Sequence, residues 1–184
     1  MAENPCLEFF ESHLNDGEKV KALVKDGRGD EWLAAGLCAS AFSPGVVTSD
    51  EVIVRQVHSP LHWDPETQVV KPGFYDDLTN KGLSVNRVDH VEELDALTEE
   101  SEARARSSNR EAIGFVKFPA SAAQEISKMV DGGSVGVFDT ALQNDRSHAD
   151  VCQTTGATRA HGRELRQKMF QALKECFHRG PLKK

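Results

Sequence analysis

The sequence has 184 residues, of which 39% are hydrophobic and 28% charged, and its formal net charge is −7. This balance is typical of one folded domain with a sizeable core and argues against a disordered chain. No run approaches the roughly 20 apolar residues of a membrane span, and the acidic N-terminus does not resemble a secretory signal. We therefore expect a single α+β domain over residues 1–184 in the cytoplasm, with no membrane partner.

The four cysteines, Cys6, Cys38, Cys152 and Cys176, are widely spaced and form no CxxC pair. A zinc knuckle and a thioredoxin-type motif are therefore excluded, and in a reducing compartment these residues are expected to be small buried side chains. A catalytic thiol stays open as an alternative. The sequence also has no Walker A, GxGxxG or GxSxG motif, so we expect no cofactor.

Charge is unevenly distributed, because residues 158–184 contain eight Lys or Arg against two Glu while the rest of the chain is acidic. An acidic body argues against nucleic acid as the main partner, although the C-terminal end is basic. Acidic small proteins often complement the surface of a basic partner, so a protein partner is expected.

Residues 1–45 are predicted to be helical. Asn4 and Pro5 suit an N-cap followed by proline at the first helical position. Asp30 suits the cap of a second, more apolar helix that ends at Ser43-Pro44-Gly45.

The rest of the chain, residues 50–180, is predicted to contain the sheet. Runs rich in β-branched residues predict strands at 52–57 and 83–87, separated by a long loop with a short helix near Phe74–Leu78. Residues 98–111 carry many charges and no large apolar side chain, so we expect an exposed, mobile segment in which a solvated helix frays.

A βαβ-like unit follows, with strands at 113–118 and 134–138 around a helix over 120–130 that Pro119 opens and Gly132-Gly133 closes. An amphipathic stripe over 158–178 predicts a C-terminal helix. The fold class is therefore α+β, with a small mixed sheet that contains all four predicted strands. A barrel-like or split sheet stays open as an alternative.

Polar residues that suit a site gather in the run RQVHSPLHWD, which contains Arg55, His58, His62 and Asp64. A divalent metal site needs imidazole and carboxylate ligands, which His58, His62, Asp64 and His148 could supply. Their spacing lacks the geometry of a helical HExxH motif. The alternative interpretation is that the histidines order a long loop by binding its carbonyl groups.

A second pair, His148 and Asp150, follows the strand predicted at 134–138. We expect His58 to lie beside this pair, so that His58, His148 and Asp150 are the candidate catalytic residues. Arg55 and Arg87 are candidate ligand-binding residues, since two guanidinium groups suit a phosphate. A structural role for the histidines stays the competing hypothesis.

The segments RQVHSPLHWD, LSVNR and NDRSHADV, taken in order, resemble a pattern in small uncharacterised bacterial proteins. These have an RQVHP-like strand end, an LSV strand and an NPAHA-like turn, and the resemblance covers about residues 52–151. Ser59 and Asn144-Asp145-Arg146 depart from the pattern. The resemblance implies that the three segments form one structural neighbourhood, and it carries no activity.

Two functions are compatible with these observations. The first is a non-catalytic accessory or immunity-type subunit that binds a protein in a bacterial multi-gene system, related to defence or toxins. The alternative is an enzyme or ligand-binding domain that acts on a phosphate-containing or nucleotide-like molecule through the His/Arg cluster. The sequence does not decide whether the protein is an enzyme.

Overall fold

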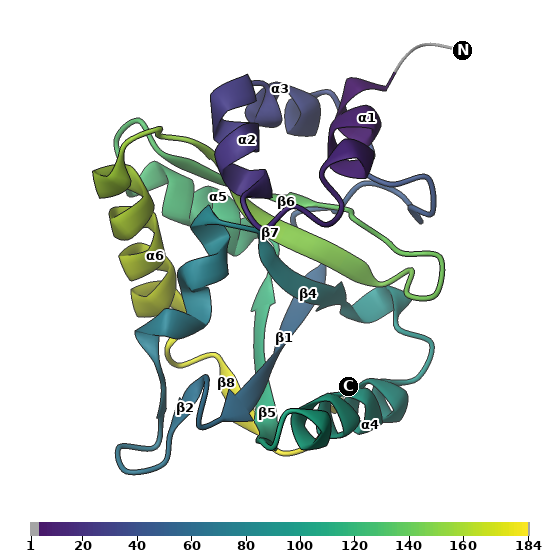
Figure 1. Cartoon of the computed structure of the whole chain (residues 1–184), viewed down its shortest axis with the longest axis vertical. Helices are drawn as coiled ribbons and strands as arrows, with labels where there is room; N and C mark the ends of the chain where they lie inside the picture. Colours follow the sequence, from purple (N-terminus) through teal and green to yellow (C-terminus); the bar gives the residue numbers. More distant parts are fainter. Residues whose placement is uncertain (1–3, 184) are drawn as a thin grey trace.

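The computed structural model describes residues 4–183 and has the predicted α+β fold (Figure 1). The helices are α1 (Pro5–Ser12), α2 (Lys19–Asp26), α3 (Gly29–Ala34), α4 (Leu94–Ser107), α5 (Ser121–Lys128) and α6 (Arg159–Leu173), with short 3-10 helices η1 (Pro72–Thr79) and η2 (Val88–His90). The strands are β1 (Val52–Ser59), β2 (Trp63–Asp64), β3 (Val69–Val70), β4 (Leu83–Arg87), β5 (Glu111–Pro119), β6 (Ser134–Phe138), β7 (His148–Thr155) and β8 (Phe177–Arg179).

Six strands form one sheet in the order β6-β7-β4-β1-β5-β8, and β2 and β3 form a small separate ribbon. All four strands predicted from the sequence belong to the large sheet, as expected. Hydrogen-bonded neighbours run antiparallel throughout. The predicted βαβ-like unit is β5–α5–β6, in which the two strands share a direction but have β1, β4 and β7 between them.

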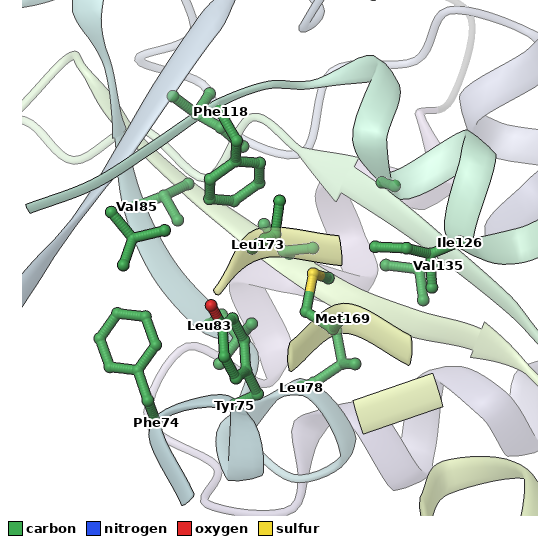
Figure 2. Packing of buried hydrophobic residues seen from close by; sticks show 14 of the residues in the cluster. Phe74, Tyr75, Leu78, Leu83, Val85, Phe118, Ile126, Val135, Met169 and Leu173 are labelled. Atoms are coloured by element: carbon green, nitrogen blue, oxygen red, sulfur yellow. The ribbon is translucent and has the colours of Figure 1, made fainter. Parts of the chain in front are cut away.

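The main core lies on one face of the sheet, beneath η1, α5 and α6. Figure 2 shows how side chains from all three helices meet those of the strands there. Ile126 of α5 and Met169 of α6 are fully buried against strand residues such as Val135. Burying a side chain of this size contributes about 1.5–3 kcal/mol, so this face is the main source of stability.

The opposite face is covered by two separate groups of helices (Figure 1). Helices α1–α3 pack over β6 and β7, where Phe10 and Trp32 are buried against Phe138. Helix α4 packs over β1 and β5, where Leu97 meets Val54. Between these two groups, β4 and β7 present polar side chains.

Local signals explain where several elements begin. The Asn4 side chain accepts a hydrogen bond from the backbone N–H of Leu7 at 3.2 Å, with Pro5 at the start of α1, as predicted. The Thr158 hydroxyl likewise accepts from the backbone N–H of His161 at the start of α6. Such a cap stabilises a helix by about 1 kcal/mol.

Two predicted helix ends are wrong. Helix α3 ends at Ala34 rather than at Ser43-Pro44-Gly45, and Asp30 lies inside the helix, because the N-cap residue is Arg28. Helix α6 ends at Leu173, and Phe177 lies in β8, where it pairs with Val116 and packs on Trp63 with ring centroids 4.6 Å apart. The pairing depends on Gly114, since a Cβ there would collide with the carbonyl oxygen of His178. An edge strand with free hydrogen-bonding groups favours such an addition over a longer helix.

The charged segment at 98–111 is more ordered than expected. Helix α4 continues to Ser107, and Ser101 and Ala105 are each only 1% exposed. Small side chains at this spacing let the helix lie close to the sheet, a contribution that charge content does not reveal. Within residues 4–183, no helix combines the length and apolar content that crossing a bilayer requires.

Candidate functional site

A cavity of about 680 Å³ lies between the N-terminal segment and the polar surface of β4 and β7. Its floor comes from Ser84 of β4 and from His148 and Asp150 of β7. Its walls come from the end of α1, the loop before α2, residues 39–42 and residues 140–144. The cavity therefore combines segments that are distant in the sequence.

A buried ion pair holds one side of the floor. The Nζ atom of Lys19 lies 2.6 Å from Oδ2 of Asp150, and the two side chains are 9% and 4% exposed. The Ser84 hydroxyl donates to Oδ1 of the same carboxylate at 3.4 Å. Gly82 packs directly against Asp150, where a Cβ would lie 3.1 Å from that of the aspartate. The carboxylate is thus fixed in position by contacts to both of its oxygens.

His148 lies beside this carboxylate. Its Nδ1 is 3.0 Å from the backbone carbonyl oxygen of Thr140, and a carbonyl only accepts, so we assign the proton to Nδ1. In the neutral ring Nε2 then carries a free lone pair, and it lies 4.0 Å from Oδ1 of Asp150. Two acceptor atoms therefore stand side by side in the cavity floor.

Apolar atoms make up most of the exposed cavity surface, although Glu11, Asp16 and Asn144 also belong to its lining. Phe10 and Ala39 are buried, whereas Leu14 and Phe42 are 60% and 45% exposed at the rim. Leu142 adds another apolar side chain. A mainly apolar wall with a few convergent polar groups is the usual composition of a small-molecule site.

The floor lacks the arrangement of a hydrolytic triad. Ser84 and His148 both face Asp150, and in residues 4–183 no hydrogen bond joins the serine hydroxyl to the imidazole. A nucleophile needs a base within hydrogen-bond reach to accept its proton. The floor of the cavity therefore does not contain a serine–histidine pair of that kind.

Arg87, a predicted ligand-binding residue, has a different role. Its Nε and Nη2 donate to both oxygens of Glu51 at 2.7 and 2.8 Å, and Nη1 donates to the carbonyl oxygen of Gly45 at 2.7 Å. Nη2 also donates to Val46, and Nη1 lies 3.3 Å from Asp139. The guanidinium is buried with its donors directed at protein groups, so it has none to offer a phosphate.

The carboxyl groups around Arg87 have opposite pKa shifts. Burial raises the pKa of Asp139 to about 6 even though Arg87 opposes it. Burial also acts to raise the pKa of Glu51, but Arg87 and the backbone N–H of Thr48 together outweigh it and lower the pKa. Both shifts fit a structural ion-pair cluster that ties the 45–51 segment to the sheet.

Arg55, the other predicted ligand-binding residue, also binds protein groups. Nη1 donates to the backbone carbonyl of Ser84 at 3.0 Å, and Nη2 lies 3.5 Å from Asp77. The guanidinium carbon stands 4.8 Å from the centre of the Phe74 ring. Neither arginine lines the cavity, so the expected phosphate clamp does not form.

His58 is buried in β1 beneath α4, where Nε2 lies 3.1 Å from the Ser101 hydroxyl. His148 pairs with Asn86, and Asn86 pairs with Val54, which precedes His58 by four residues along β1. Strand geometry then separates the two histidines by roughly 15 Å. The expected neighbourhood of His58 with His148 and Asp150 does not form.

The metal alternative is not assembled either. His62 stacks beside His58, with Nδ1 accepting from the backbone N–H of His58 at 3.2 Å. Asp64 instead accepts from backbone N–H groups of the following turn. In the part of the chain that the structure describes, no three His, Cys, Asp or Glu side chains are placed to hold a metal.

Both histidines, buried His58 and half-buried His62, favour the neutral form. Burial lowers the pKa of His62 to about 3, with nearby Arg55 acting in the same direction. Burial and then Arg104 lower the pKa of His58. These two residues have the loop-ordering role that was the alternative hypothesis.

No protein-family model, no curated protein and no solved structure matches the chain. The resemblance of residues 52–151 to a bacterial pattern therefore stays a prediction. The same holds for the location in the cytoplasm.

Sequence reasoning identified His148 and Asp150, but placed them in a turn after a strand, whereas both lie in β7. It missed Lys19, which lies 131 residues from its partner Asp150. The segment KVKALVKD contains three lysines, and the sequence does not show that one of them, Lys19, is buried. The interleaved apolar positions of α2, which pack Val20 and Leu23 inward, were the available signal.

Proposed function

We propose that this protein binds a small, largely apolar molecule in the cavity between α1, α2 and the β4–β7 surface. The observation that carries the proposal is the composition of that cavity. Its volume of about 680 Å³ falls within the usual range for ligand sites, and a mostly apolar surface surrounds a small set of polar groups.

The proposal differs from the phosphate-directed alternative in its ligand. The two lysines of the lining, Lys19 and Lys81, both face carboxylates, at 2.6 Å from Asp150 and 3.6 Å from Asp77. A phosphate requires free cationic donors, so the cavity does not favour it.

The test is a fragment screen by ligand-observed NMR on the full chain. Ala41 is exposed and lines the cavity, so Ala41→Trp should fill the space without disturbing the core. Ala103 is exposed on α4, away from the cavity, and Ala103→Trp is the matched control.

We expect fragments that bind the wild type to bind Ala103→Trp equally and to lose at least about tenfold in affinity for Ala41→Trp. Equal binding by Ala41→Trp would place the ligands elsewhere on the protein. A screen without any binder would refute the proposal.

A second candidate is the accessory, protein-binding role. Leu14 and Phe42 are large, exposed and adjacent to the cavity, so an apolar side chain of a partner protein is an alternative occupant. The test is co-purification with the products of neighbouring genes. Phe42→Ser should abolish it, whereas Val69→Ser, at an exposed position on the β2–β3 ribbon, should not.

A further inference from the structure

The floor of the cavity has more acceptors than donors. Nε2 of His148 and Oδ1 of Asp150 are 4.0 Å apart, and the second oxygen of Asp150 is already bound by Lys19. Within residues 4–183, the one group that donates to Oδ1 is the Ser84 hydroxyl, at the long distance of 3.4 Å. Both atoms can therefore accept a further hydrogen bond.

One nitrogen atom fits between these acceptors. A donor with two protons reaches both at about 2.9 Å when the acceptors are about 4 Å apart. The Ser84 hydroxyl, which lines the same cavity, can also accept a hydrogen bond. A protonated primary amine supplies this set of donors, whereas a hydroxyl supplies one and a carboxylate none.

The charge of the lining favours the same group. Three carboxylates, Glu11, Asp16 and Asp150, line the cavity against two lysines, and each lysine lies within 4.0 Å of a carboxylate. Among the described residues, no cationic side chain lies within 4.0 Å of Glu11 or Asp16. The charge that remains unpaired in the cavity is therefore negative.

We propose that the ligand of this cavity is an apolar amine, whose ammonium group bridges Nε2 of His148 and Oδ1 of Asp150. Its apolar body lies against Phe10, Leu14 and Phe42. The inference rests on the proposed function, since it names the class of molecule that the same cavity binds. Aromatic side chains in the wall also favour an aromatic body, because aromatic pairs gain attraction beyond the area that they bury.

Three indoles with nearly the same body test this inference by calorimetric titration of the full chain at neutral pH. Tryptamine carries an ammonium group, tryptophol a hydroxyl and indole-3-propionate a carboxylate. We expect tryptamine to bind at least about tenfold more tightly than tryptophol, with indole-3-propionate weakest.

Two variants locate the ammonium group. His148→Phe removes the acceptor at a partly exposed position, and should reduce the preference for tryptamine over tryptophol to about threefold or less. Glu11→Gln should weaken tryptamine alone, by about twofold, whereas Glu8→Gln, exposed on the same helix outside the cavity, should not.

The possible failures separate the two proposals. If tryptophol or indole-3-propionate binds as tightly as tryptamine, the amine inference is overturned and the cavity keeps its proposed function. The inference also falls if none of the indoles binds while fragments from the screen do. If no fragment binds, the proposed function itself is refuted.

Discussion

Lys19→Met is expected to destabilise the protein strongly, because it leaves the carboxylate of Asp150 buried without a cation. The side chain of Asp150 is 4% exposed and that of Lys19 is 9% exposed, so water screens the pair little. Breaking such a buried pair by removing one partner costs about 3–5 kcal/mol. In a domain of this size the melting temperature should fall by about 6–20 °C.

The same helix supplies the control. Lys21 pairs with Glu18, and these side chains are 58% and 69% exposed, so Lys21→Met should cost less than about 1 kcal/mol. Urea unfolding of both variants measures the difference. Adding Asp150→Asn to Lys19→Met should recover part of the loss, because the amide carries no charge to bury. Equal costs for Lys19→Met and Lys21→Met would show that burial does not decide the strength of the pair.

Three further predictions concern the ion-pair cluster and the buried histidines. Arg87→Met should cost about 3–5 kcal/mol in urea unfolding, because Glu51 loses its buried partner; a cost below 1 kcal/mol would contradict the structural role. Ser101→Ala should cost about 1–3 kcal/mol by leaving Nε2 of His58 unpaired, and a neutral result would mean that this hydrogen bond is unimportant. The folded-state pKa of His62, about 3, lies below that of the unfolded chain, so the unfolded state binds more protons and the free energy of unfolding falls as pH drops from 7 to 5. His62→Asn should reduce that fall by about 1–2 kcal/mol. An unchanged pH dependence of stability would refute the assignment.

The sequence was sufficient to predict the strands whose side chains are β-branched or aromatic. Strand β1 places Ile53 and Val54 on opposite faces, and both are fully buried, so its pattern is strong. Strand β7 was missed although it lies between β6 and β4. Its run HADVCQTT mixes small, polar and charged residues, because one of its faces meets the core and the other forms part of the cavity.

The candidate site was less predictable, since the same residue type, aspartate, has different roles at different positions. Arg87 and Asp139 are buried in a structural cluster, whereas His148 and Asp150 line the cavity. The residues next to each of these positions in the sequence do not distinguish the two roles. They depend on which segment covers each side chain, and for β7 that segment begins more than a hundred residues earlier in the chain.

The position of Lys19 links the stability of the N-terminal segment to the existence of the cavity. Helices α1 and α2 dock through apolar contacts of Phe10 and Leu23, and the Lys19–Asp150 pair joins them to the floor itself. Because the same segment supplies much of the cavity wall, its undocking would expose Asp150 to water and remove the wall together. A ligand bound there contacts both parts, so it stabilises the docked state in proportion to its affinity. Ligand binding should therefore raise hydrogen-exchange protection in α1 and α2 as well as at the cavity floor.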